Sequence, residues 1–231
     1  MSQEHRIIGK YQLGDCIGKG AYGAVYRALN IHTGKVVAIK QVITSGDDSS
    51  EIIASTKHPN IVKYYGCEQT ARDLNIILEY CEGGSLQSVV SKFGQISEKL
   101  VGVFTYQTLC GLSYLHSKEI IHRDIKAANL LYTKSGVVKL SDFGTSRLYD
   151  GKQTMAGSPY WVAPEVITMN GSTRASDIWS LGCTVIQLFT GEAPFQKLSV
   201  PSALFHMVNE DRPPLPPNSS PVFFYSISCR I

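Results

Sequence analysis

The 231-residue sequence lacks the features that mark membrane, nucleic-acid-binding and disordered chains. No apolar run approaches the roughly 20 residues that a membrane-spanning helix needs, and residues 1–10 contain no apolar signal core. The formal net charge of +3 is too small an excess to indicate nucleic-acid binding. With 43% hydrophobic and 10% aromatic residues, the composition also argues against disorder. We therefore expect a globular protein of one large domain or two small lobes, with a cytoplasmic or nuclear location.

Paired metal-ligating or disulfide-forming cysteines are also missing. The six cysteines form no C-x-x-C pair and no Cys/His cluster. They are Cys16, Cys67, Cys81, Cys110, Cys183 and Cys229. This scatter favours free, mostly buried thiols over zinc ligands or disulfide bonds.

What is present is a change of hydrophobic period along the chain. Short runs rich in Val, Ile, Tyr and Leu, separated by turn residues, predict the strands Tyr11–Gly14, Ala24–Leu29, Val36–Val42, Ile61–Cys67 and Leu74–Tyr80. From Ser85 onward the apolar spacing becomes helical, first over Leu100–Leu115 and again over Ile178–Thr190. We therefore predict an α+β protein, with an N-terminal sheet lobe joined to a mainly helical lobe near Glu79–Gly84.

A glycine-rich segment, Gly18-Lys19-Gly20-Ala21-Tyr22-Gly23, matches G-x-G-x-x-G. In a dinucleotide-binding fold these glycines would open a helix, but Ala24–Arg27 reads as a strand, which predicts a hairpin instead. A glycine hairpin lets backbone approach phosphate groups closely. Lys40 follows Gly23 by 17 positions at the end of an apolar strand. Taken alone, it is better explained as a lysine that reaches solvent.

Three further motifs follow in order. His122–Leu131 has the form H-R-D-x-K-x-x-N, with Asn129 five positions after Asp124. Asp142-Phe143-Gly144 begins 13 positions after Asn129, and Ala163-Pro164-Glu165 ends 23 positions after Asp142. Together with the glycine segment and Lys40, this order resembles the catalytic domain of eukaryotic protein kinases over about Tyr11–Pro217. The resemblance implies a bilobal fold with an N-terminal tail at 1–10 and a kinase domain at 11–231, divided into an N-lobe (11–80), a hinge (81–84) and a C-lobe (85–231).

The resemblance also implies a protein serine/threonine kinase that uses ATP and Mg²⁺. Asp124 would accept the proton from a substrate hydroxyl or orient it, and Lys126 would neutralise the γ-phosphate. Lys40 would pair with the α- and β-phosphates, while Asn129 and Asp142 would hold Mg²⁺ with hard oxygen ligands. The implied nucleotide-binding residues are Ile17, Gly18, Gly20, Gly23, Val25, Ala38, Lys40, Glu79, Cys81 and Leu131. His122 and Phe143 would be internal packing residues.

Regulation and subfamily are implied by shorter strings. Thr154 lies in the polar segment Thr145–Ala156, where a phosphate could pair with Arg123; an unmodified threonine explains it equally well. Gly157–Trp161 is similar to the corresponding segment of STE-group kinases. Strings such as Ala175–Val185 resemble the fungal septation-initiation kinases and their plant MAPKKK-epsilon relatives. That likeness implies a cytokinesis or MAPKKK-like cascade with an upstream small GTPase or activating kinase.

Two stretches depart from the family pattern. Glu51 is the candidate partner for Lys40, but it lies only 11 positions after Lys40 and seven before His58, so the helix expected there is shortened. The residues after Pro221 match none of the family's last helices, which predicts an incomplete C-lobe. Glu165 would then lose its arginine partner, at a cost of about 3–5 kcal/mol if its carboxylate is buried.

The sequence therefore predicts a protein serine/threonine kinase that acts on protein substrates, with no nucleic acid and no membrane span. The alternative is a catalytically impaired, pseudokinase-like nucleotide-binding or scaffold module, because both departures affect the active state and not the catalytic motifs. A dinucleotide oxidoreductase is excluded by the strand after the glycine segment and by the loop from His122 to Asn129.

Overall fold

The computed structural model describes residues 6–20, 23–43, 56–70, 73–142, 147–148, 158–216 and 220. The chain divides into two compact units, Met1–Lys57 with Val62–Cys81 and His58–Ile61 with Glu82–Ile231. The first unit is a sheet and the second is mainly helical, which confirms the predicted α+β class.

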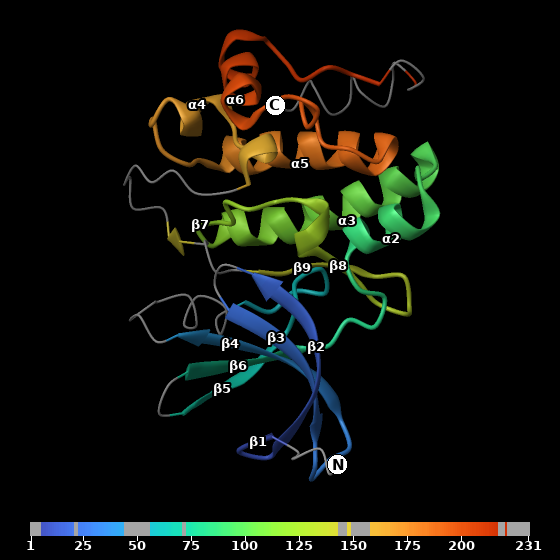
Figure 1. Ribbon diagram of the computed structural model, residues 1–231, viewed down its shortest axis with the longest axis vertical. Helices are drawn as coiled ribbons and strands as arrows, with labels where there is room; N and C mark the ends of the chain where they lie inside the picture. Colours follow the sequence, from blue (N-terminus) through green and yellow to red (C-terminus); the bar gives the residue numbers. More distant parts are fainter. Residues whose placement is uncertain are drawn as a thin grey trace. The chain divides into compact units, whose positions relative to one another are not determined.

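The first unit is a six-stranded antiparallel sheet in the order β1-β2-β3-β4-β6-β5 (Figure 1). Its strands are β1 (Ile7–Ile8), β2 (Tyr11–Gly20), β3 (Gly23–Asn30), β4 (Val36–Ile43), β5 (Tyr64–Gln69) and β6 (Asp73–Glu79). Two details differ from the sequence-based expectation. Ile7 and Ile8, assigned to an N-terminal tail, pair with β2, and Ile8 is buried among core side chains. The strand predicted from Ile61 begins only at Tyr64, because Ile61 belongs to the second unit, where it forms a bridge with Leu140.

The two faces of this sheet carry different chemistry because side chains alternate along a strand. On β4, Val37 and Ile39 belong to a buried apolar cluster on one face. Ala38 and Lys40 therefore point to the other face, where Lys40 is paired with Val25 of β3. Of the residues predicted to bind the nucleotide, Val25, Ala38 and Lys40 thus share one face, and the apolar cluster occupies the opposite one.

The second unit contains the helices α2 (Leu86–Phe93), α3 (Glu98–Ser117), α4 (Pro164–Ile167), α5 (Arg174–Thr190) and α6 (Val200–Asn209). Short 3₁₀ turns lie at Ala127–Asn129 and Pro159–Trp161, and the short strands are β7 (Ile120–Ile121), β8 (Leu130–Tyr132), β9 (Val138–Leu140) and β10 (Arg147–Leu148). Helices α3 and α5 lie side by side at the centre of the unit (Figure 1). Its core is therefore built on two long, apolar helices.

Helix α5 begins four residues before the predicted start at Ile178. The reason is a reciprocal cap: the Thr173 side chain accepts from Ser176 N–H, and the Ser176 hydroxyl accepts from Thr173 N–H. Gly191, with φ 92°, ends the helix in the left-handed region. The early start places Asp177, which is 1% exposed, in the first turn of the helix.

The prediction of mostly buried thiols is wrong. Of the five described cysteines, only Cys81 and Cys183 are buried, while Cys16 and Cys67 are exposed on strands β2 and β5. A strand at the surface turns every second side chain to solvent, whatever its polarity. Burial raises the pKa of the Cys183 thiol to about 12, so that this thiol stays protonated at neutral pH. None of the described helices has the length and apolarity that crossing a bilayer requires.

We predict that Gly23→Ala destabilises the chain far more than Gly34→Ala. Both glycines have positive φ, +131° and +70°. A Cβ atom on Gly23 would lie 1.8 Å from the Gln41 carbonyl oxygen, whereas one on Gly34 would meet nothing within 4 Å. We expect a loss of roughly 1–2 kcal/mol for Gly34→Ala from backbone strain alone, and more than about 3 kcal/mol for Gly23→Ala. Urea denaturation measures both, and equal losses would contradict the clash.

Candidate active site

The loop between β7 and β8 brings the side chains of Asp124, Lys126 and Asn129 together. The Asp124 carboxylate is its centre: Oδ2 lies 2.9 Å from Lys126 Nζ and accepts a 2.8 Å hydrogen bond from Asn129 Nδ2. The Asp124 and Lys126 side chains are 11% and 23% exposed, so solvent still reaches both. A carboxylate and an ammonium group are thus fixed within contact of each other on one short loop.

Ser158 joins this pair from the start of the 3₁₀ turn before α4. Its hydroxyl donates to Asp124 Oδ1 at 2.9 Å and accepts from Lys126 Nζ at 2.6 Å. The hydroxyl is therefore hydrogen-bonded to both the Asp124 carboxylate and the Lys126 ammonium group, which also contact each other directly. A serine at this place shows that the carboxylate can accept a hydrogen bond from an aliphatic hydroxyl group.

Hydrogen bonds from its amide nitrogen to Asp124 orient the Asn129 side chain. Both hydrogen bonds of Nδ2 go to Asp124, one to the backbone oxygen and one to Oδ2, each at 2.8 Å. The amide oxygen is thereby left as the atom that can ligate a cation. The Asn129 backbone oxygen accepts two 2.9 Å bonds from Ser141, the residue before Asp142. An amide oxygen and a carboxylate on neighbouring segments form a donor set of the kind that Mg²⁺ prefers, so these residues fit a divalent cation.

A buried carboxylate on α5 holds this loop in place. Asp177 Oδ2 accepts from His122 N–H and Oδ1 from Arg123 N–H, both at 2.9 Å, and His116 Nε2 lies 2.8 Å from Oδ2. Arg123 has φ 70°, a left-handed conformation that costs free energy for a residue with a side chain. The paired N–H bonds stabilise that conformation immediately before Asp124.

Sequence reasoning did not assign a role to Asp177. The residue appeared only within a string that resembles one kinase subfamily, and its partners lie more than 50 positions earlier in the chain. A signal existed, because a carboxylate in the first turn of an otherwise apolar helix is unusual unless it has partners. This pattern predicts that the carboxylate is buried and hydrogen-bonded, but it does not predict which groups it binds.

In the first unit, the predicted phosphate-binding residues lie around the β2–β3 hairpin. Gly20 pairs with Gly23 and Gly18 with Val25, which confirms that the glycine segment forms a hairpin between two strands. Val25 in turn pairs with Lys40 on β4. Ile17, the residue before the first glycine, is 47% exposed. The strand pairing therefore places the glycines, Val25 and Lys40 on adjacent strands.

The remaining residues predicted to bind the nucleotide lie on strands β4, β6 and β8 or just after one. Ala38 on β4 pairs with Leu78 on β6 and is buried. Glu79 ends β6, where its N–H donates to the Lys63 carbonyl at 2.8 Å, and Cys81 follows as a buried residue. Leu131 belongs to the second unit, on β8, where it forms a bridge with Ser85.

Several sequence-based predictions lie outside the described residues. These are the glycine-segment positions Ala21 and Tyr22, the candidate glutamate Glu51, the motif residues Phe143 and Gly144, the regulatory candidate Thr154 and the C-terminal residues 221–231. Glu165 is described and is only partly buried. Its carboxylate has no Lys or Arg within 4.0 Å among the described residues. Because solvent reaches it, the large burial cost expected for a lone Glu165 does not apply.

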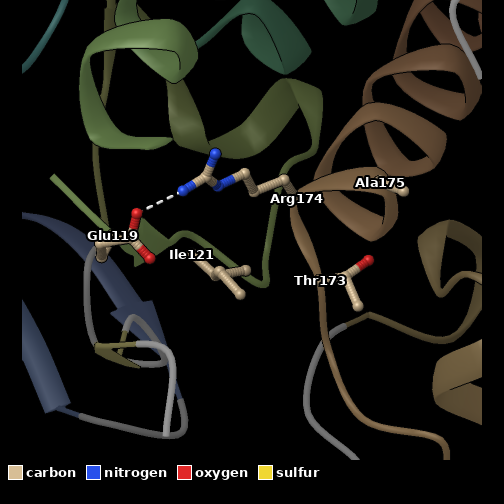
Figure 2. Close-up of a pocket in the computed structure, with 5 residues that line it drawn as sticks. All are labelled: Glu119, Ile121, Thr173, Arg174 and Ala175. Atoms are coloured by element: carbon tan, nitrogen blue, oxygen red, sulfur yellow. Dashed lines mark hydrogen bonds and ion pairs between the residues drawn. The ribbon is translucent and has the colours of Figure 1, made fainter. Parts of the chain in front are cut away.

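A cavity of about 360 Å³ lies elsewhere in the second unit, where β7 meets the start of α5. It is lined by Glu119, Ile121, Thr173, Arg174 and Ala175, and Figure 2 shows the Arg174 guanidinium group reaching toward Glu119. That ion pair measures 2.5 Å and is more than half exposed on both sides. None of the lining residues is among the predicted site residues, so this cavity is not the candidate active site.

We predict that Asp177→Ala costs about 3 kcal/mol or more in the free energy of unfolding. The substitution leaves two buried backbone N–H groups and the His116 ring without their acceptor. The matched control is Asp15→Ala, which removes an ion pair to Arg27 whose carboxylate is 77% exposed, and should cost less than about 1 kcal/mol. Chemical denaturation distinguishes the two, and similar losses would show that Asp177 is not an anchor.

The sequence matches a family model and several known proteins. The family model "Protein kinase domain" matches residues 11–220. The chain is 53% identical over 219 residues to "Cytokinesis protein sepH" of Aspergillus terreus, covering 91% of this chain and 16% of that protein. It is 52% identical over 219 residues to "Cell division control protein 7" of Schizosaccharomyces pombe, covering 90% of this chain and 21% of that protein. It is 48% identical over 238 residues to "MAP3K epsilon protein kinase 1" of Arabidopsis thaliana, covering 95% of this chain and 17% of that protein. The chain thus spans 16 to 21% of the length of these relatives.

Proposed function

Because the chain belongs to the protein kinase domain family, we propose that it transfers the γ-phosphoryl group of ATP to serine or threonine hydroxyl groups of protein substrates. The observation that carries the proposal is the Asp124–Lys126–Asn129 loop with Ser158. Protein kinase domains use ATP and a divalent metal ion in general. The relatives include a protein named as a probable serine/threonine-protein kinase, 47% identical over 229 residues.

The contacts of the loop support a distinct role for each side chain. Asp124 accepts a hydrogen bond from the Ser158 hydroxyl at 2.9 Å, so it can hold a substrate hydroxyl group in the same way and receive its proton. Lys126 Nζ, 2.9 Å from that carboxylate, compensates negative charge that develops on the transferred group. The proposed reaction thus needs no covalent intermediate on the protein, only positioned charges.

Mg²⁺ is the divalent ion we propose, bound by Asn129 and Asp142 through oxygen atoms. When bound, it neutralises charge on the phosphate oxygens. Lys40 would hold the α- and β-phosphates, and the glycine backbone at Gly18, Gly20 and Gly23 would line them. The further proposed nucleotide-binding residues are Ile17, Val25, Ala38, Glu79, Cys81 and Leu131, of which Glu79 and Cys81 would contact adenine. We also propose the lobe boundaries 11–80 and 85–231, with the hinge at 81–84; of the preceding residues 1–10, Ile7–Ile8 add a short strand to the sheet.

The names of the relatives support a proposed biological setting. Two of those compared carry names that refer to cytokinesis or cell division, and a third carries the name of a MAP3K. We propose that this chain acts in a cytokinesis or MAPKKK-like cascade, on a protein substrate and below a small GTPase or an activating kinase. A cytoplasmic location stays a prediction.

We expect Asp124→Asn and Lys40→Met each to reduce phosphoryl transfer at least about 100-fold without unfolding the chain. Asp124→Asn removes the proton acceptor at constant volume, and Lys40→Met removes a charge but retains most of the side-chain length. The assay follows radiolabel from γ-³²P-ATP with Mg²⁺ into a protein substrate, and circular dichroism checks the fold. Asp15→Asn, which changes an exposed carboxylate, is the matched control and should keep wild-type activity. Absence of transfer by the wild-type chain would favour the impaired, scaffold-like alternative.

Ser158 gives a finer test of the loop geometry. Ser158→Thr keeps the hydroxyl group that contacts Asp124 and Lys126, so its activity should stay within about threefold of wild type. Ser158→Ala removes two hydrogen bonds to charged groups and should lower kcat about 10- to 100-fold. Steady-state kinetics with a peptide substrate measures both. Equal activity of the two variants would show that the hydroxyl bridge has no part in the reaction.

A further inference from the structure

Four cationic side chains surround one aromatic cluster in the first unit. The guanidinium group of Arg6 lies 5.9 Å from the ring centroid of Tyr26, and Lys10 Nζ lies 5.8 Å from that of Tyr11. Lys35 and Lys63 converge on Tyr65, with Nζ atoms 3.8 and 5.7 Å from its ring centroid. All three tyrosines pack in the same apolar cluster with Ile39 and Ile77. The cations therefore surround a single patch, which we call the basic face (Arg6, Lys10, Lys35 and Lys63).

The strand register explains why the cations gather. Lys10, Lys35 and Lys63 each precede the first residue of a strand, β2, β4 and β5 respectively. The Lys10 carbonyl accepts from Ile31 N–H and the Lys35 carbonyl from Asn30 N–H, so both lysines flank the end of β3. Glu79 N–H donates to the Lys63 carbonyl, and Glu79 pairs with Val37, two residues after Lys35. The three lysines thus lie at one end of the sheet, and the Arg6 carbonyl accepts from Leu13 N–H close to that end.

None of the four cations has a carboxylate within 4.0 Å among the residues that the structure describes. Glu79, the acidic neighbour of Lys63, accepts a 3.1 Å hydrogen bond from the Lys63 backbone N–H. By contrast, Arg27 on the same sheet forms a 2.8 Å ion pair with Asp15. All four cations are exposed to solvent and form no ion pair among the described residues, while the Glu68 carboxylate lies beside Gly9 and the Glu79 carboxylate beside the Lys63 backbone.

This face is separate from the proposed phosphate-binding residues. Tyr26 and Ile39 are paired across β3 and β4 and point to the face of the apolar cluster. Val25 and Lys40 are the next pair and point to the opposite face because side chains alternate. A molecule bound to the basic face would leave the face that bears Lys40 open.

We propose that the basic face is a docking surface for an acidic segment of a partner protein, rich in Asp and Glu. Charge complementarity carries the choice of occupant: four exposed cations without carboxylate partners attract an extended run of carboxylates. The three tyrosine rings lie partly or wholly buried beneath the cations. Ile7, Ile31 and Val36 are 56, 47 and 42% exposed beside the cations, and an extended acidic segment can cover them between its carboxylates. Binding to an anionic membrane is the competing outcome that the test distinguishes. Binding here is independent of phosphoryl transfer and persists if the proposed catalytic activity fails.

The test is binding of a fluorescein-labelled 12-residue peptide of alternating Glu and Ser to the full chain, measured by fluorescence anisotropy at two salt concentrations. The variant Arg6→Gln/Lys10→Gln/Lys35→Gln/Lys63→Gln should weaken binding at least about tenfold. The control Lys92→Gln/Lys99→Gln/Lys118→Gln/Lys134→Gln removes the same charge from exposed lysines of the second unit and should change binding less than about twofold. Higher salt should weaken binding to wild type and to the control.

The quadruple variant loses four cation–ring contacts, and this loss alone could unfold the sheet. A second variant with fewer substitutions is therefore included. Lys35→Gln/Lys63→Gln leaves Arg6 and Lys10 in place and should still weaken peptide binding by several-fold, with the fold checked by thermal melting. Equal weakening by the control variant would overturn the proposal, since it would show a response to net charge alone. Wild-type binding to vesicles containing phosphatidylserine without binding to the peptide would also overturn it, in favour of a membrane surface. Failure of the wild-type chain to bind either probe would leave the cations with a purely structural role and overturn it as well.

Discussion

The active-site geometry depends on one buried carboxylate. Asp177 is 1% exposed and accepts hydrogen bonds from two consecutive backbone N–H groups, those of His122 and Arg123. A carboxylate is excluded from such a site unless its oxygen atoms are satisfied, so the loop must present those N–H groups to it. To present them, the loop adopts a left-handed conformation at Arg123. The anchor and the strained residue therefore stabilise each other, and α5, fixed at its start by the Thr173–Ser176 cap, holds them both.

The position of Asp124 follows from this anchor. Asp124 comes directly after Arg123, whose conformation is fixed by the anchor. Its carboxylate contacts the side chains of Lys126, Asn129 and Ser158. Ser141, the residue before Asp142, fixes the far end of the loop by donating two hydrogen bonds to the Asn129 backbone oxygen. A short loop fixed at both ends to rigid elements can hold charged groups in a defined geometry without a helix or strand of its own. That arrangement is what phosphoryl transfer requires of a protein whose chemical contribution is positioning.

The hydrophobic period predicted most of the strands and both long helices, because burial of an alternating or helical apolar pattern dictates local structure. The acid, base and amide of the loop were predictable as well, since they lie within six positions and keep a recognisable spacing. Other features were not, because they depend on partners far along the chain. Ile61 looked like part of a strand but pairs with Leu140, and Asp177 contacts residues more than 50 positions away. The exposure of Cys16 and Cys67 likewise depends on which side of a strand faces solvent, and cysteine type alone does not report it.

Asp177 should make the loop before Asp124 as resistant to local opening as the core of helix α5. Amide hydrogen exchange followed by NMR at His122 and Arg123 tests it directly, because both N–H groups are bonded to the buried carboxylate. We expect these two amides to exchange as slowly as the buried amides in the middle of α5, opening only with cooperative unfolding of the unit. Exchange at the rate of an open surface loop would contradict it, because the loop would then not be anchored in the folded chain.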